Sequence, residues 1–381
     1  MPNCYLSYNN ILSSLGFDTT SVFEHLKTGK SGIQPVQDPT RFYKSVFAAV
    51  IPTDTLNSEF ETLEAKHQYT RLEKMLIVSL SKTIKASGVT INNRIGLIIS
   101  TTKGNIDILN SQSQFPNERV YLGTLGHVVK DFFSFENDAI VISNACVSGV
   151  LAVAVAKRYI QEGLYDAVFV VAGDLVSDFV ISGFNSFQAL SHGPCRPYDK
   201  DRIGINLGEV AASVLVTTKK EELSEDAVEV LGEGSCNDAN HISGPSRTGE
   251  GLYRSITSAL KEANMHSNDI DYISAHGTAT AFNDEMEAIA FNRLRLHETP
   301  LHSLKGYFGH TLGASGLLET LVGMQSLRQN TLIASAGFET LGVSKPLNII
   351  TKTTAKELRT FLKTASGFGG CNTAALFRKV S

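Results

Sequence analysis

One cysteine stands where a strand-like segment gives way to a helical one. Residues 139–142 have the pattern of a buried strand and residues 149–161 that of a helix closed by Gly163, so Cys146 falls at a strand-to-helix turn. Unpaired backbone N–H groups and the positive end of a helix dipole favour the thiolate at such a turn. A lone cysteine in an apolar segment is also commonly just a small buried hydrophobe, so a nucleophile needs partners elsewhere in the chain.

Two histidines take comparable positions further along. His276 follows a strand-like segment at 270–274, and His310 lies at the mouth of an apolar helical segment that begins at Ser315. Near the C-terminus, the glycine-rich turn 366–370 could point backbone amides at a ligand. A single histidine is more often structural than catalytic, but a cysteine and two histidines at strand ends and helix starts rarely coincide by accident.

The elements that must position these side chains alternate between strand and helix patterns. This alternation predicts an α/β fold with layered packing and buried central helices. Residues 174–191 have a loop-rich pattern, and residues 105–136 support no assignment. The other strands are expected at 94–101, 167–172, 211–217 and 228–231, and the other helices at 20–26 (capped by Thr20 or Ser21), 69–86 and 251–263.

An internal similarity divides the chain. Ser148-Gly149 and Ser315-Gly316 each open an apolar helical segment, and the strands at 95–100 and 271–274, each followed by a turn with Thr and Gly, recur at nearly the same offset. We therefore expect two similar halves, residues 1–218 and 219–381, with the charged stretch that starts at Lys219 as the boundary.

Composition narrows the function classes. The chain has 381 residues, 42% of them hydrophobic, and a net charge of -4, which argues against binding to nucleic acid or a membrane surface. Five cysteines without paired spacing indicate reduced thiols, not a disulfide framework or a zinc site. The N-terminus lacks the pattern of a signal peptide, and the apolar stretch 139–156 is interrupted and too short to span a bilayer. We expect a cytoplasmic protein.

These motifs together resemble the β-ketoacyl synthase (condensing enzyme) family of the thiolase fold. The resemblance covers essentially the whole chain. Within the family, the chain is similar to the elongating synthases II of bacterial fatty-acid synthesis and to relatives in type II polyketide and aryl-polyene pathways. Its most specific part is His310 with Lys305 five residues before it and Glu319 nine after it. The matching segments run from Leu15-Gly16 through Cys146, Arg196-Pro197-Tyr198-Asp199, His276 and Lys305/His310 to Gly367-Phe368-Gly369-Gly370.

The resemblance implies a fold and a reaction. The fold would be two duplicated βαβαβαββ halves in an α-β-α-β-α arrangement, residues 1–218 carrying Cys146 and residues 219–381 the two histidines. Cys146 would take an acyl chain from the phosphopantetheine of an acyl carrier protein. Decarboxylation of malonyl-carrier protein would give an enolate stabilised by neutral His276 and His310, and its attack on the acyl group would give 3-oxoacyl-carrier protein. The oxyanion of that attack would lie between the N–H groups of Cys146 and Phe368.

Further roles follow from the same resemblance. Lys305, with Asp284 and Glu287 nearby, would fix the electrostatics and orient the histidines. Phe368 would be the gate for the acyl chain. The other implied residues are Thr278, Thr280, Gly369 and Gly370 for the pantetheine and substrate, and Glu319 as a supporting group. No cofactor and no metal are implied, because the substrates arrive on the carrier.

Three positions depart from the family pattern. Val210 replaces the second glycine of the usual Gly-Glu-Gly, Ser274 stands where asparagine is common, and Cys371 stands where threonine is usual. The changes at Ser274 and Cys371 argue against a house-keeping role in fatty-acid synthesis and against a structural cation near Glu319. They leave the catalytic set unchanged.

The implied partners are an acyl carrier protein and a second subunit, giving a homodimer or a heterodimer with a chain-length factor. Lys66, Arg71 and Lys74 lie where similar synthases carry their docking cations, although such a charge run is commonly only a solvated helix face.

Two other functions compete. A non-catalytic chain-length factor would not need the intact cysteine and histidines, and a thiolase would use a second cysteine such as Cys371.

Overall fold

Ten strands form the framework of the chain in the computed structural model, which describes residues 2–38, 40–110, 113–238 and 244–380. Their order in the sheet is β11-β10-β14-β15-β9-β1-β8-β6-β4-β5, and β1 and β9 join at its middle through the pairs Tyr5–Glu229 and Leu6–Val228. The strands of the first arm are β1 (Tyr5–Ser13), β4 (Ile95–Ser100), β5 (Ile140–Ile142), β6 (Ala167–Asp174) and β8 (Val210–Thr217). Those of the second are β9 (Val228–Asn237), β10 (Tyr272–Ser274), β11 (Leu301–His302), β14 (Thr360–Gly367) and β15 (Cys371–Lys379).

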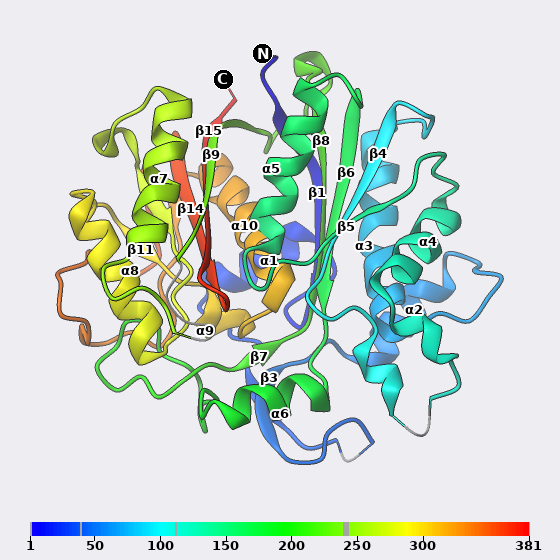
Figure 1. Cartoon of the computed structure of the whole chain (residues 1–381), viewed down its shortest axis with the longest axis horizontal. Helices are drawn as coiled ribbons and strands as arrows, with labels where there is room; N and C mark the ends of the chain where they lie inside the picture. The colour runs from blue at the N-terminus through cyan, green and yellow to red at the C-terminus, as the bar shows by residue number, and fades with distance from the viewer. Residues whose placement is uncertain (1, 39, 111–112, 239–243, 381) are drawn as a thin grey trace.

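Helices lie outside both arms and between them (Figure 1). α3 (Arg71–Ser87) packs on β1, β6 and β8, with α4 (Leu122–Phe133) beside it, whereas α7 (Glu250–Ala263) covers β9 and β15 and contacts α8 (Ala281–Arg293). α5 (Ser148–Gln161) and α10 (Ser315–Gln329) occupy the centre, where each contacts strands of both arms. The result is the expected α-β-α-β-α arrangement.

Smaller elements connect these layers. The short helices are α1 (Thr19–Lys27), α2 (Thr53–Glu61), α6 (Asp178–Ser186) and α9 (Lys305–Phe308). A three-stranded sheet contains β2 (Gln34–Val36), β3 (Val46–Ala49) and β7 (Leu207–Gly208), and a two-stranded one contains β12 (Thr331–Leu332) and β13 (Thr354–Ala355).

The chain order repeats in the two arms. β1-α3-β4-α4-β5-α5-β6-β8 is followed by β9-α7-β10-α8-β11-α10-β14-β15, so each arm has the expected βαβαβαββ order among its main elements. The exact boundary between residues 218 and 219 remains a prediction. It falls between β8 and β9, in the charged connection that the sequence singled out.

The Ser-Gly repeat marks the point where the two central helices cross. A Cβ atom added to Gly149 would lie 2.6 Å from the backbone nitrogen of Leu317, and one added to Gly316 would lie 2.7 Å from that of Val150. The helices therefore touch through their backbones near their first turns, which only glycine at both positions allows. This contact sets the start of α5, next to Cys146, against the start of α10, close to His310.

Local sequence explains where the outer helix α3 begins and ends. Thr70 accepts a hydrogen bond from the Glu73 backbone N–H, and the Glu73 carboxylate accepts one from the Thr70 N–H, which closes a capping box. Gly88 ends the helix in the left-handed region at φ 64°. One side of α3, including Leu72, Met75 and Leu76, is buried against the sheet, so the amphipathic pattern predicted this helix correctly.

Some expectations were wrong. Residues 174–191 contain the helix α6, which Ser177 caps by accepting from the Val180 N–H, where a loop-rich segment was expected. The N-cap of α1 is Asp18 instead of Thr20 or Ser21. The sequence analysis also assigned no strand to β1, although it lies at the centre of the sheet. In the part of the chain that the structure describes, no helix combines the length and apolar character that a bilayer span requires.

Candidate active site

Cys146 lies between the end of β5 and the start of α5, as predicted. The residue before it, Ala145, has φ 43°, in the left-handed region that a residue with a side chain seldom adopts. This sharp turn places the cysteine at the N-terminal end of α5, where 8% of the residue is exposed. The local strain is typical of a site in which one side chain must be held at a fixed angle.

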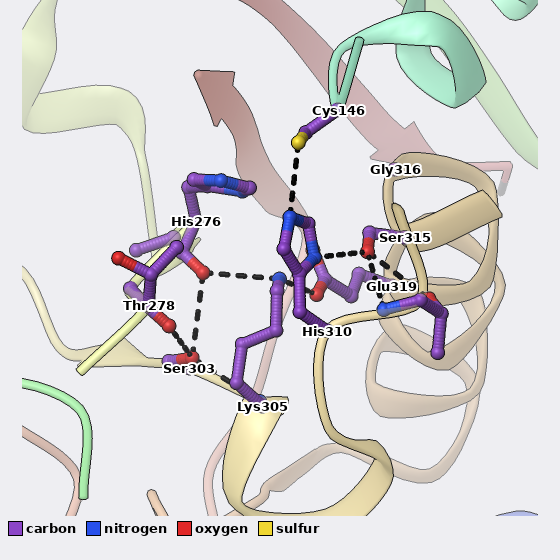
Figure 2. A network of polar contacts seen from close by, with 12 residues as sticks. Cys146, His276, Thr278, Ser303, Lys305, His310, Ser315, Gly316 and Glu319 are labelled. Carbon is purple, nitrogen blue, oxygen red and sulfur yellow. Dashed lines mark hydrogen bonds and ion pairs between the residues drawn. The ribbon is translucent and has the colours of Figure 1, made fainter. Parts of the chain in front are cut away.

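The side chains of both histidines lie next to this cysteine (Figure 2). Nε2 of His310 lies 2.9 Å from Sγ of Cys146, and the rings of His310 and His276 are 5.2 Å apart at their centroids with an 80° angle between their planes. One nitrogen of each ring and the cysteine sulfur lie within 4.8 Å of one another. The fold thus brings together three groups from distant parts of the sequence. In the described residues they also form the one cluster of three side chains that could hold a metal ion.

Burial keeps all three groups neutral at rest. It raises the pKa of Cys146 to about 12, with a further increase from the neighbouring Cys371 that Lys305 partly offsets. It also lowers the pKa of both histidines well below 6.5, helped by the nearby charge of Lys305. The sequence analysis expected the helix end to favour the thiolate, but desolvation is larger. A thiol in this environment needs a base within reach, and His310 is in contact with it.

The other side of the His310 ring is held by a pair of hydroxyl groups. Nδ1 of His310 lies 3.0 Å from Oγ of Ser315. That oxygen accepts a hydrogen bond from the Thr311 backbone N–H at 3.1 Å and lies 3.0 Å from Oγ1 of Thr311. The His310 backbone N–H donates to the Asn206 carbonyl at 2.7 Å. Contacts of the ring nitrogen and of the backbone N–H therefore both fix the position of His310.

A buried carboxylate between two lysines lies beneath the histidines. Lys305 forms an ion pair with Glu319, and its ammonium also donates to the His276 carbonyl at 3.1 Å. Lys363 lies 2.6 Å from the other oxygen of Glu319. Although burial acts to raise it, the two lysines hold the pKa of Glu319 below its usual value. The two ammonium groups outnumber the one carboxylate of Glu319, so this cluster of three side chains carries a net positive charge.

Two further carboxylates hold the backbone of the His276 loop. Glu287 accepts hydrogen bonds from the backbone N–H groups of His276 at 2.9 Å and Gly277 at 2.7 Å. Asp284 accepts from the N–H groups of Thr278 at 2.9 Å and Tyr198 at 2.7 Å. Burial raises the pKa of Asp284 to about 7, against the effect of these donors. Both residues therefore lie where the sequence analysis put them, but they contact backbone groups of the loop and not the histidine rings.

A cavity of about 430 Å³ connects the cysteine and histidines with the surface. Thr278 and Thr280 line it, and their hydroxyl oxygens are 2.8 Å apart. Phe368, on the turn between β14 and β15, lies over the cysteine side of the cavity, stacked on Phe184 with ring centroids 5.7 Å apart. The Phe187 ring meets it edge-on at 5.3 Å. These aromatic rings from α6 and the following residue flank the predicted gate.

The glycine turn has the geometry that close approach requires. Gly369 and Gly370 have φ 84° and 76°, which residues with side chains rarely adopt. A Cβ added to Gly367 would lie 3.0 Å from the backbone nitrogen of Cys146 and 2.9 Å from Sγ of Cys371. The turn therefore runs directly beside the Cys146 N–H. The joint role of the Cys146 and Phe368 N–H groups in binding an oxyanion remains a prediction.

The expected docking cations do not form one exposed face, which corrects the sequence analysis. Arg71 lies 2.7 Å from the fully buried carboxylate of Glu209, which also pairs with Arg41, and only 13% of the Arg71 side chain is exposed. Lys74 donates to Asn57 at 2.8 Å and lies 5.6 Å from the centre of the Phe60 ring. Lys66 is exposed. Arg71 thus forms an ion pair inside the protein, which helix spacing alone does not reveal, and the docking role of the three cations stays a prediction.

The sequence analysis missed four residues of the site. Ser315 was recognised as a helix start but not as a partner of His310, and Thr311 was not singled out. Lys363 lies within the buried strand β14, where a single lysine gives no pattern, and Phe184 fell in the segment interpreted as loop. The one available signal is that Lys363 directly follows Phe361 and Leu362, since a lysine that is buried in a strand needs a partner.

The chain is similar to known proteins over nearly its whole length. A family model described as beta-ketoacyl synthase, N-terminal domain, matches residues 10–222, and one for the C-terminal domain matches residues 227–339. The 3-oxoacyl-[acyl-carrier-protein] synthase 2 of Coxiella burnetii is 27% identical, covering 97% of this chain and 97% of its own length. The tetracenomycin polyketide synthase ketoacyl synthase alpha subunit of Streptomyces glaucescens is also 27% identical, over 96% of this chain and 94% of its own.

The solved structures extend the likeness to the fold. A ketosynthase in complex with its chain length factor from Xenorhabdus doucetiae superposes with a TM-score of 0.86 at 26% identity, covering 100% of this chain and 98% of that one. A beta-ketoacyl synthase from Burkholderia phymatum gives a TM-score of 0.86 at 23% identity over both whole chains. Matching family models, full-length relatives and the same architecture together show that the chain belongs to the β-ketoacyl synthase family.

Proposed function

We propose that this chain condenses an acyl group held on Cys146 with malonyl-acyl carrier protein, releasing carbon dioxide and giving 3-oxoacyl-acyl carrier protein. The observation that carries the proposal is the contact of Cys146 with His310 at 2.9 Å, with His276 facing the same space. A nucleophile beside two neutral imidazoles is what acyl transfer followed by enolate formation needs.

In the first half-reaction, Cys146 becomes acylated. The thiol proton moves to Nε2 of His310, because burial alone leaves the thiol neutral. The thiolate attacks the thioester carbonyl, the bond to the carrier sulfur breaks, and the carrier leaves as a thiol with the proton from His310. The Thr278 and Thr280 hydroxyls in the cavity wall would hold the polar part of the pantetheine arm during this step.

In the second half-reaction, the malonyl carboxylate leaves as carbon dioxide. The electron pair of the broken bond forms an enolate whose oxygen accepts hydrogen bonds from the N–H groups of His276 and His310. The enolate carbon attacks the acyl carbonyl on Cys146, and the cysteine thiolate is expelled and takes up a proton from solvent. The positive balance of Lys305 and Lys363 around Glu319 favours the anionic enolate just above it.

The carrier would approach through the cavity mouth, where large apolar side chains are exposed. Phe187, Ile203 and Phe282 are 54%, 62% and 78% exposed, and all three line the cavity. Because Arg71 is buried in an ion pair, we place carrier docking on this apolar rim, with Lys66 and Lys74 as the remaining cations of the expected three. The Ile203→Ser/Phe282→Ser double variant should raise the KM for carrier-bound substrate and leave turnover of small thioester analogues unchanged.

We also propose that the chain works as a dimer, either with itself or with a chain-length factor. The outermost strand β5 offers a sheet edge with three half-buried apolar residues, Ile140, Val141 and Ile142. The similar ketosynthase from Xenorhabdus doucetiae is described in complex with its chain length factor. Five free cysteines agree with a cytoplasmic location, and the chemistry requires no cofactor beyond the pantetheine of the carrier.

A non-catalytic partner subunit is the second candidate, since such subunits share this fold. The complete cysteine and histidine set argues against it. The test uses purified chain with acyl-carrier and malonyl-carrier protein, alone and with a co-expressed partner. Formation of 3-oxoacyl-carrier protein that disappears in Cys146→Ala supports the synthase. Equal product formation by Cys146→Ala in the presence of the partner would identify the chain as the non-catalytic subunit.

A further inference from the structure

The ammonium group of Lys363 is surrounded by oxygen atoms from three elements of the fold. Its Nζ donates to the backbone carbonyls of Ser274 at 3.0 Å, Ala275 at 3.4 Å and Thr364 at 2.6 Å. It also lies 2.6 Å from a carboxylate oxygen of Glu319, and the Lys363 side chain is 0% exposed. Ser274 is the last residue of β10 and Glu319 belongs to α10, whereas Lys363 itself is in β14. One buried nitrogen thus joins β10, β14 and α10.

This shell of oxygen atoms is the kind that binds a small cation. Hard cations take carboxylate and backbone carbonyl oxygens as ligands, and K⁺ is bound by carbonyls alone in some sites. Burial lowers the pKa of Lys363, and the charge of Glu319 acts against that effect. A neutral amine would turn its lone pair toward one of these acceptors, whereas an ammonium has a hydrogen for each of three and a charge that attracts the fourth. The geometry therefore fits the charged form.

The carbonyls that Lys363 holds come directly before a histidine of the site. Ser274 and Ala275 precede His276, whose own carbonyl accepts from Lys305 at 3.1 Å (Figure 2). Three successive carbonyls therefore point at the two ammonium groups. Because a buried carbonyl that lacks a donor is costly, the two lysines stabilise the backbone conformation from which the His276 side chain extends.

We propose that Lys363 serves as a built-in monovalent cation. Its ammonium occupies an oxygen-lined site that would otherwise bind an ion such as K⁺, and there it positions the His276 backbone against α10 and β14. Lys363 lies outside the set of described residues that line the cavity, so it is a positioning residue and not a catalytic one. The proposal rests on the proposed function where it concerns the task of His276, but the ion site itself does not depend on the reaction. It also gives a physical reason why no structural cation is expected near Glu319, since the ammonium takes that place.

Lys363→Ala and Lys363→Met test the site as a matched pair. Both remove the ammonium, but alanine leaves its space open, whereas methionine is unbranched, of similar length and fills most of it. A K⁺ ion can therefore reach the four oxygens in Lys363→Ala and is kept out in Lys363→Met. The probe is KCl, compared with choline chloride at the same ionic strength, because choline is too large for the site.

The first measurement is the melting temperature, followed by circular dichroism, which needs no substrate. We expect K⁺ at about ten times its Kd to raise the melting temperature of Lys363→Ala by roughly 3 °C, and to leave Lys363→Met and the parent unchanged. If Lys363→Ala is unfolded in choline chloride, its folding in KCl counts as the same result. The absence of any K⁺ effect on Lys363→Ala, an equal effect on Lys363→Met, or a K⁺-dependent melting temperature of the parent would each overturn the inference.

The second measurement is the decarboxylation of malonyl-carrier protein, which depends on the position of His276. In choline chloride both variants should turn over about 100-fold more slowly than the parent, the cost of a small misplacement of a reacting group. KCl should restore part of the rate in Lys363→Ala and none in Lys363→Met. A K⁺ ion that restores the melting temperature without restoring decarboxylation would overturn the positioning of His276. Lack of malonyl turnover in the parent would count against the proposed function instead, and the melting temperatures would still decide the ion site.

Discussion

Replacing Arg71 with methionine separates a structural cation from a docking cation. In the structure Arg71 contacts both oxygens of Glu209, at 2.7 and 3.3 Å, and donates to Thr53 at 3.0 Å. Methionine keeps much of the apolar volume and removes the charge. Glu209, which is fully buried, is then left with Arg41 as its one remaining cation.

The magnitude follows from that burial. Removing one partner of a buried ion pair costs about 3–5 kcal/mol, and the remaining Arg41 places the expected loss near the lower value, about 3 kcal/mol. At about 2 °C per kcal/mol for a chain of this size, the melting temperature should fall by roughly 6 °C. Lys66→Met, at an exposed position, is the matched control and should change the unfolding free energy by no more than about 0.5 kcal/mol.

The pH dependence gives a second signature. Although burial opposes it, Arg71 and Arg41 lower the pKa of Glu209, so its contribution to stability is present above the unfolded-state pKa and is lost as pH falls through the folded-state pKa. Without Arg71 the folded-state pKa rises, and acid unfolding of Arg71→Met should begin at a higher pH. Thermal unfolding followed by circular dichroism from pH 4 to pH 8 measures both effects. A parental melting temperature together with a raised KM for carrier protein would show that Arg71 is a docking cation and refute this reasoning.

Other predictions concern the site itself. An acyl donor or cerulenin should modify Cys146, as located by mass spectrometry, and modification of Cys371 instead would contradict the synthase assignment. His310→Ala should retain measurable acylation of Cys146 while decarboxylation falls about 100- to 1000-fold; unchanged malonyl turnover would show that the role is misassigned. Because burial lowers the pKa of His276 and His310 well below 6.5, decarboxylation should be independent of their titration between pH 6.5 and pH 8 and decline only as pH falls further. A rate that halves near pH 7 would mean that a histidine is charged at rest. Gly149→Ala should lower both stability and condensation, since its Cβ would lie 2.6 Å from backbone in the facing helix; a parental melting temperature would show that the helices separate easily.

The sequence was most informative where a chemical group sits at the end of a regular element. Cys146 was identified between a strand pattern and a helix pattern, and His310 was identified at the mouth of an apolar helix. Their meeting followed from the resemblance to the family, and the crossing at Gly149 and Gly316 gives it a physical cause. Burial was harder to anticipate. It raises the pKa of Cys146 where the helix end alone predicts a lower value.

Contacts between distant segments were beyond sequence patterns. Arg71 has the spacing of an exposed helical cation, but its partner Glu209 lies 138 positions away in the sequence. Lys363 is the one charged residue of the strand β14, and only the fold shows that it reaches Glu319. The helix α6 was missed because its glycine, serine and asparagine residues are typical of loops, whereas packing of Val180 and Ile181 against the core stabilises it.

The crossing of α5 and α10 has a consequence for the synthesis of the protein on the ribosome. Synthesis proceeds from the N-terminus, so Cys146 emerges long before residue 310. Until α10 docks against α5, the thiol lacks both imidazoles and the carboxylate-lysine cluster that adjoins them. A nascent chain that has folded only its first arm therefore carries Cys146 without the imidazole that contacts it in the folded protein. Because His310 follows Cys146 by 164 positions, the contact between the thiol and its base forms only once the second arm has been synthesised and has folded.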